Sequence, residues 1–187
     1  MSNDTLTVLL QACRAGNARA IDELVNTYRP AVFRFALSFL DDPAEADDAA
    51  QEAFVDALGA LPGYRGDSTF TTWLYAITAN VCRGRLRKRR ARQHLTNALQ
   101  ALLHLGSARA APPEEQASQH ETQAAVTWAI NRLPEPQREV VVLRYYHELR
   151  LTEIAEILHV SERTVHKRLQ GAHERLRGLL AGKVSER

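Results

Sequence analysis

Long side chains that can donate hydrogen bonds share one face of a predicted helix between residues 162 and 176. They lie three or four residues apart, a spacing that brings side chains together on the surface of a helix. Donors of this length can reach the base edges that line the major groove of DNA. The set comprises Arg163, His166, Lys167 and Gln170. The chemistry predicted for this segment is therefore recognition of nucleic acid.

A preceding helix and a tight turn must hold this face outward. Residues 149–177 read LRLTEIAEILHVSERTVHKRLQGAHERLR. Apolar residues at helical spacing occupy 151–158, His159 and Val160 interrupt them, and Ser161 can cap a second helix. The second helix turns its own apolar stripe inward through Val165, Leu169, Ala172 and Leu176. The pattern is typical of a helix-turn-helix, whose second helix enters the major groove.

Charge is strongly segregated along the chain, although the formal net charge is only +2. Residues 41–56 contain seven acidic side chains and no Lys or Arg, whereas residues 83–92 contain seven basic side chains and no Asp or Glu. One chain therefore offers an acidic surface and a basic one. This arrangement suits a protein that binds both a basic protein partner and a polyanion.

The composition favours an all-α protein without a cofactor. The chain has 187 residues, 45% of them hydrophobic, and Ala and Leu dominate over β-branched and aromatic types. The sequence contains no predicted strand, no membrane-spanning run and no signal peptide, so we expect a cytoplasmic protein. Cys13 and Cys82 are expected to be buried free thiols. No spacing predicts a metal site, a cofactor site or a catalytic centre.

Helix signals divide the chain into two blocks separated by a Gly-, Ser- and Pro-rich stretch, GSARAAPPEEQASQ. In the first block Gly16-Asn17 predicts a break, and Pro30 is expected to start or kink a helix. Asp42-Pro43 predicts a capped helix start, and Ser68 or Thr69 can cap a later helix. The second block predicts four helices. The expected fold is all-α, with two small helical domains joined by a flexible linker.

Both blocks resemble a known family. Residues 43–90, PAEADDAAQEAFVDALGALPGYRGDSTFTTWLYAITANVCRGRLRKRR, resemble region 2 of the sigma subunits of bacterial RNA polymerase. Residues 133–177, LPEPQREVVVLRYYHELRLTEIAEILHVSERTVHKRLQGAHERLR, resemble region 4. The combination of DDAAQEAF, FTTWLYAITAN and the helix-turn-helix is similar to the small extracytoplasmic-function class. The resemblance implies a region 2 domain over 1–92, a linker over 93–120 and a region 4 domain over 121–187.

The resemblance also implies which residues bind RNA polymerase. In the family an acidic helix of region 2 docks on a coiled coil of the largest subunit, and the polymerase flap is a second docking site. A surface of opposite charge would orient that encounter. A merely solvated acidic helix is the alternative, but the uninterrupted sign of charge favours docking. The residues implied are Asp47, Asp48, Gln51 and Glu52.

Region 2 is further expected to open the promoter by capturing a flipped base of the −10 element. Capture needs polar groups to read the base edge and aromatic groups to replace its lost stacking. Phe70 could instead be a core residue, which is the role expected for Trp73. The residues predicted to capture the base are Tyr64, Ser68, Phe70 and Asn80. Those predicted to contact the neighbouring phosphates are Arg83, Arg87, Lys88 and Arg90.

Region 4 is expected to read the −35 element. The family often has glycine where this chain has His159 and Arg163, which changes the expected base contacts without breaking the motif. The residues implied are Arg163, Thr164, His166, Lys167, Arg168 and Gln170.

The resemblance therefore predicts an alternative sigma factor that binds core RNA polymerase and promoter DNA and is not an enzyme. It implies a stress-response role, a protein that is monomeric when free, and control by an anti-sigma factor that is often membrane-anchored. The chief alternative is a stand-alone helix-turn-helix activator. That alternative requires a receiver domain upstream, and the first block shows no alternation of strand and helix. An adaptor that binds only protein would leave the basic run without a role.

Overall fold

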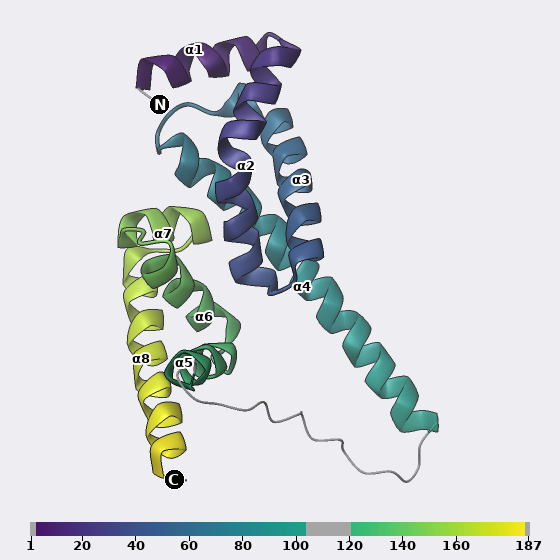
Figure 1. Ribbon diagram of the computed structural model, residues 1–187, viewed down its shortest axis with the longest axis vertical. Helices are drawn as coiled ribbons and strands as arrows, with labels where there is room; N and C mark the ends of the chain where they lie inside the picture. The colour runs from purple at the N-terminus through teal and green to yellow at the C-terminus, as the bar shows by residue number, and fades with distance from the viewer. Residues whose placement is uncertain (1–2, 104–120, 186–187) are drawn as a thin grey trace. The chain divides into compact units, whose positions relative to one another are not determined.

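The computed structural model describes residues 3–103 and 121–185, and their side chains over 4–93 and 125–181. Within these ranges the chain is helical apart from short turns and contains no strand (Figure 1). It divides into two compact units, the first built on residues 1–87 and the second holding most of the residues from 88 onward. The predicted all-α class is confirmed.

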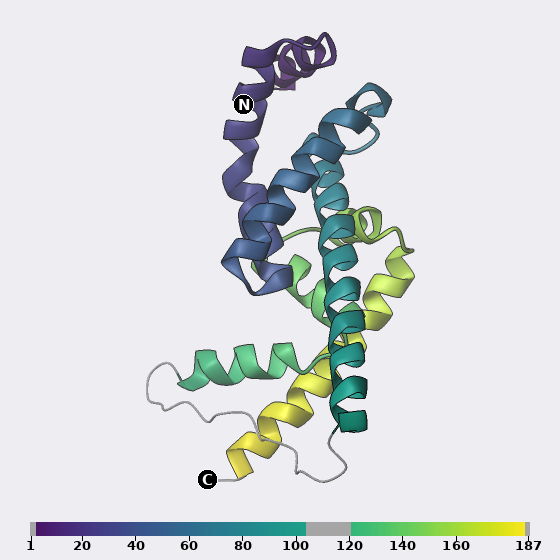
Figure 2. The same cartoon turned by 90° about the vertical axis from the view of Figure 1, so that its right-hand side faces the viewer.

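The first unit is a bundle of helices around a small core. Its elements are α1 (Asn3–Arg14), α2 (Ala18–Leu40), α3 (Pro43–Ala60), the 3-10 turn η1 (Leu61–Gly63) and the part of α4 (Phe70–Leu103) up to Arg87. Helices α2 and α3 run side by side in both views of the ribbon (Figures 1 and 2). The buried side of α3 consists mostly of alanines, which let α2 approach closely with its larger Val32, Phe35 and Phe39. This packing turns the charged side of α3 toward solvent.

Side-chain caps set the helix starts, largely as predicted. The Asn17 side chain accepts a hydrogen bond from the Ala20 amide at 3.2 Å and begins α2, and Asp42 accepts one from the Glu45 amide at 2.9 Å and begins α3. Of the two caps considered for α4, Thr69 is the one used, because its hydroxyl accepts from the Thr72 amide at 3.1 Å.

Pro30 lies inside a helix. It does not start one, because α2 continues through it from Ala18 to Leu40. Apolar side chains on both sides of Pro30 pack into the same core, and this packing outweighs the missing backbone hydrogen bond. The first residues of the predicted linker, from residue 93, continue α4, which is one unbroken helix to Leu103 (Figure 2). The remainder of that predicted linker, residues 104–120, lies outside the described residues.

The second block of the chain contains the four predicted helices and one additional turn. They are α5 (Glu121–Asn131), α6 (Glu135–Val141), α7 (Leu151–Leu158) and α8 (Glu162–Ser185), with a π-helical turn η2 (Val142–Tyr146) after α6. Helix α8 packs against α5 and α6. Ile154, Ile157 and Val165 are fully buried, and truncation of such side chains typically costs about 2–5 kcal/mol.

The turn of the helix-turn-helix explains a departure from the family pattern. His159 has φ of 53°, in the left-handed region, and Ser161 then caps α8 by accepting from the Thr164 amide at 3.2 Å. A side chain with a Cβ is strained in that region, whereas glycine is not. The position therefore favours the glycine that the family often has there.

Replacing His159 by glycine is expected to raise the free energy of unfolding by roughly 0.5–1 kcal/mol, because removal of the Cβ strain outweighs the greater flexibility of the unfolded chain. Urea unfolding followed by circular dichroism measures the change. Glu156→Gly, on the exposed side of α7, is the control and is expected to lower stability by about 1 kcal/mol. Equal loss in both variants would contradict a left-handed residue at 159.

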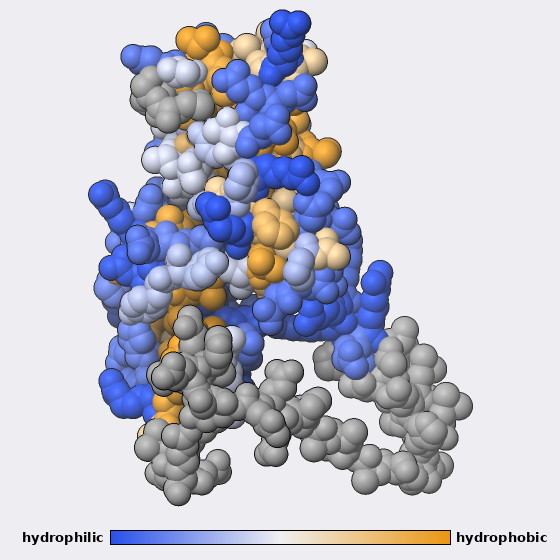
Figure 3. Space-filling model, viewed as in Figure 1, coloured by the Kyte–Doolittle hydropathy of each residue, from blue (hydrophilic) through white to orange (hydrophobic). Residues whose placement is uncertain are grey.

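Apolar side chains are largely inside and polar ones outside. Both cysteines are buried and free, as expected, and burial raises the pKa of Cys82 to about 12. Hydrophilic residues cover most of the face in Figure 3. No helix in the described ranges has the length and hydropathy needed to cross a bilayer.

Candidate nucleic-acid and protein-binding surfaces

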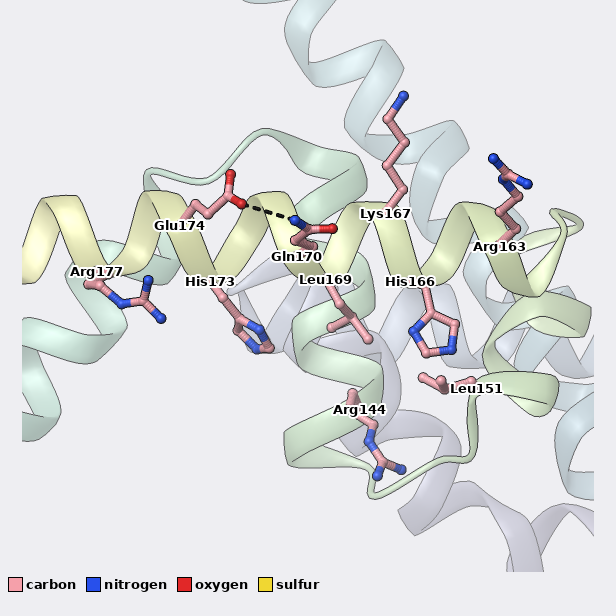
Figure 4. A pocket seen from close by; sticks show the side chains of 10 residues that line it. All are labelled: Arg144, Leu151, Arg163, His166, Lys167, Leu169, Gln170, His173, Glu174 and Arg177. Carbon is pink, nitrogen blue, oxygen red and sulfur yellow. Dashed lines mark hydrogen bonds between the residues drawn. The ribbon is translucent and has the colours of Figure 1, made fainter.

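The exposed side of α8 borders an open groove of about 840 Å³ in the second unit. Figure 4 shows how its side chains divide around the helix. Lys167 and Arg163 extend together on one side, while His166 and His173 point toward the side where Arg144 lies. The groove is lined by far more cationic and neutral donors than acids, with Glu174 the one carboxylate among its lining residues. Such a surface attracts a polyanion.

The predicted −35 residues fall into two groups. Arg163, His166, Lys167 and Gln170 are all exposed on α8, and Gln170 donates to Glu174 at 3.2 Å. Thr164 is half-buried, and its hydroxyl is paired with that of Ser161 at 2.8 Å in the cap of α8. Arg168 is half-buried as well. The structure therefore brings the four long donors together on one surface, while Thr164 serves the helix start.

An aromatic cluster fixes the loop between η1 and α4. The Phe70 ring lies 5.0 Å from that of Tyr28, 5.7 Å from Tyr64 and 5.5 Å from Trp73, between ring centroids. Tyr64 is half-buried, and its hydroxyl donates to the backbone carbonyl of Ser68 at 2.7 Å. Burial within this cluster raises the pKa of Tyr64 above its ordinary value.

The structure corrects the interpretation of Phe70. Its side chain is only 2% exposed, so the ring offers no face on which a flipped base could stack. Apolar contact with three neighbouring rings outweighs exposure in the loop, and the core alternative is the one observed. Tyr64 and Ser68 remain half-exposed beside it. Phe70 therefore packs in the core beside one of the predicted base-capturing residues, Tyr64.

Asn80 and the basic run continue along α4. Asn80 is exposed, and its side-chain oxygen accepts from Arg83 at 2.9 Å. It follows Trp73 by seven residues, about 10 Å or two turns further along the same side of the helix. Beyond it Arg87, Lys88 and Arg90 are exposed as predicted. The candidate −10 surface thus runs from the 64–68 loop along one helix.

Arg14 anchors this loop, a role that sequence reasoning missed. From the end of α1 its Nε donates to the Leu61 carbonyl at 3.2 Å, and a terminal nitrogen donates to the Tyr64 carbonyl at 2.6 Å. Nothing in the local sequence predicts bonds across 47 and 50 residues. The loop that presents Tyr64 is therefore held at both of its ends, by Arg14 and by the cap at Thr69.

Arg14→Ala is expected to speed amide hydrogen exchange in residues 61–66 by about tenfold, because two charge-assisted hydrogen bonds that hold the loop are lost. Exchange resolved by mass spectrometry on the full chain measures the effect. Arg19→Ala, at an exposed position of α2, is the control and is expected to change nothing there. Unchanged exchange in Arg14→Ala would show that the aromatic cluster alone holds the loop.

The predicted docking residues share the exposed side of α3, and we call Asp47, Asp48, Gln51 and Glu52 the docking face. Two arginines from flanking helices contact it. Arg29 of α2 donates to Asp47 at 3.0 Å, and this bond lowers the pKa of that carboxyl, with a smaller effect from Gln51. Arg85 of α4 donates to Glu52 at 2.7 Å. The face is acidic, as predicted, but the chain's own cations partly neutralise it.

Comparison with known proteins places the chain in a family. The sequence model of Sigma-70 region 2 matches residues 24–92, and that of Sigma-70, region 4 matches residues 124–176. The chain is 34% identical over 171 residues to the RNA polymerase sigma-H factor of Pseudomonas aeruginosa, covering 89% of each protein. The chain belongs to the extracytoplasmic-function sigma factors of the sigma-70 family.

Two further relatives support this family assignment. The ECF RNA polymerase sigma factor SigW of Bacillus subtilis is 30% identical, with 90% of this chain and 92% of SigW covered. A solved structure of CnrH in complex with the cytosolic domain of CnrY has a TM-score of 0.65 at 27% identity, covering 94% of this chain and 96% of that one. This sigma factor is thus an alternative transcription initiation factor and not an enzyme. No group of residues that could hold a metal ion occurs in the described part of the chain.

Proposed function

We propose that this sigma factor binds core RNA polymerase through the docking face of α3, and promoter DNA through two surfaces. The observation that carries the proposal is that an exposed acidic face and an exposed cationic helix occur in separate compact units of one chain. The acidic face lies within the residues matched to region 2, and the cationic helix within those matched to region 4. The acidic face suits a basic protein partner, and the cationic helix suits a polyanion.

The −10 element would meet Tyr64, Ser68 and Asn80, with phosphates held by the basic run of α4 at Arg83, Arg87, Lys88 and Arg90. The −35 element would meet Arg163, His166, Lys167 and Gln170 of α8. Support comes from their exposure and from the grooved, mainly cationic surface along α8. Two weak DNA readers on one polymerase raise each other's effective concentration. For that purpose we propose a region 2 domain over 1–92, a connection over 93–120 and a region 4 domain over 121–187.

Control by a second protein is part of the proposal. The solved relative CnrH is in complex with the cytosolic domain of CnrY. We propose an anti-sigma factor for this chain, a cytoplasmic location, and a free state that is monomeric. Pull-down with the chain as bait, followed by mass spectrometry, is the test for such a partner.

Binding of the purified, fluorescently labelled protein to core RNA polymerase tests the function itself. Tight binding that a housekeeping sigma factor displaces is expected, because both would occupy the same docking site. Run-off transcription that requires the added chain is the second expected result. Binding to duplex DNA without any binding to core polymerase would favour the stand-alone activator instead.

A further inference from the structure

An arginine of the chain itself contacts two carboxylates of the docking face. The Nε and one terminal nitrogen of Arg85 both donate to the same oxygen of Glu52, at 3.1 and 2.7 Å. The other terminal nitrogen lies 3.8 Å from a carboxylate oxygen of Asp48. The guanidinium of α4 therefore lies across two of the acids on α3.

Arg85 is less exposed than the two cations that follow it in the run. Its side chain is 26% exposed, whereas Arg87 and Lys88, which follow it on α4, are exposed. It points at α3 and so does not extend the phosphate-binding surface proposed for α4. Sequence alone places Arg85 within a run of cations, and only the fold, across 33 residues, pairs it with Glu52.

The contacts of Arg85 with Glu52 and Asp48 are not explained well by a contribution to folding stability. The Glu52 side chain is 48% exposed and that of Asp48 is 69% exposed, so solvent screens both contacts. Solvated pairs of this kind contribute little to folding. The contacts still change the surface potential, because a positive charge lies where a basic partner would approach.

We propose that Arg85 is an internal competitor for the docking face. In the free protein it holds Glu52 and Asp48, and cations of the polymerase must share or displace it in order to bind there. Arg85 is thus a positioning residue that weakens the encounter with core polymerase. The inference rests on the proposed docking of α3.

The proposal predicts that a substitution of Arg85 strengthens binding to core polymerase, whereas most substitutions at a binding surface weaken it. Removal of Arg85 leaves two exposed carboxylates unpaired and makes the face more negative. Binding to a basic partner then tightens, by about two- to fivefold at low salt, on the scale of a single surface charge pair. Loss of a direct polymerase contact, or damage to the fold, would weaken binding instead.

Arg85→Gln in the full chain tests this, with affinity for core RNA polymerase measured by fluorescence at low and high salt. The expected gain shrinks at high salt because the interaction is screened. Arg85→Lys retains the charge and is expected to bind nearly as the wild type does. Arg34→Gln is the matched control, since it removes one exposed charge from α2 outside the docking face. Arg85→Met, which preserves the packing of the aliphatic stem, replaces the glutamine variant if the latter unfolds.

A double-mutant cycle separates competition from a general charge effect. If Arg85 acts through its paired acid, Arg85→Gln gains less than half as much in a Glu52→Gln background. Weaker or unchanged binding by Arg85→Gln, or an equal gain by Arg34→Gln, would overturn the inference while leaving the proposed function intact. No binding of the wild-type chain to core polymerase would overturn the proposed function, and this inference with it.

Discussion

Replacing Asp48 and Glu52 together by arginine is expected to weaken binding to core RNA polymerase on the order of 100-fold, because like charges brought together at an interface cost several kcal/mol. These two acids are the better choice for reversal, since both are well exposed on α3. Asp47 is less exposed and is already hydrogen-bonded to Arg29 and Gln51. Affinity is measured by fluorescence with labelled full-length protein.

Reversal of Asp22 and Glu23 provides the matched control. Both are exposed on α2, outside the docking face, and their reversal changes the net charge by the same amount. Circular dichroism must show that both double variants remain helical, because the new arginine at position 52 would lie beside Arg85. Equal losses in the two variants would mean that overall charge, and not this face, governs binding.

The local features of the fold were predictable because they depend on neighbouring residues. The caps at Asp42 and Ser161 each satisfy an amide three residues further on. The inward stripe of α8 was also predicted correctly, since Val165 and Ala172 are fully buried and the long donors between them are exposed. Periodicity and capping are properties of short segments, so one sequence is enough to read them.

Features that depend on distant parts of the chain were not predictable. Arg85 was counted in a basic run, but its partner Glu52 lies on another helix. Phe70 was predicted to meet DNA, and only the rings of Tyr28, Tyr64 and Trp73 around it explain its burial. The sequence showed which side chains were aromatic or charged but not which of them would meet.

The conformation of His159 was predictable only in part. Its place in the turn was predicted from the break between two apolar stripes, and the family resemblance suggested that glycine often stands there. The sequence did not show why. The φ of 53° supplies the physical reason, because a side chain with a Cβ has a local conformational cost there that glycine does not have.

Arg163→Ala combined with Lys167→Ala is expected to weaken binding to promoter duplexes by about 30-fold or more, because specific contacts from long cationic side chains are each worth about 1–3 kcal/mol. The two side chains extend together on one side of α8 (Figure 4). Since both side chains are exposed, their loss should leave the fold unchanged. Fluorescence anisotropy with the reconstituted holoenzyme measures the affinity.

The two single variants then separate the reading of bases from the binding of phosphates. Selection from duplexes randomised over the −35 element should lose its preference at one base pair for the residue that reads a base edge, and keep every preference for the residue that binds phosphate. A phosphate contact should also lower the slope of log affinity against log salt by about one. Arg175→Ala, an exposed cation further along α8 and outside the groove lining, is the control. If it weakens binding as much as the paired substitution does, the exposed donors of α8 act only through their charge, and the −35 element is read elsewhere.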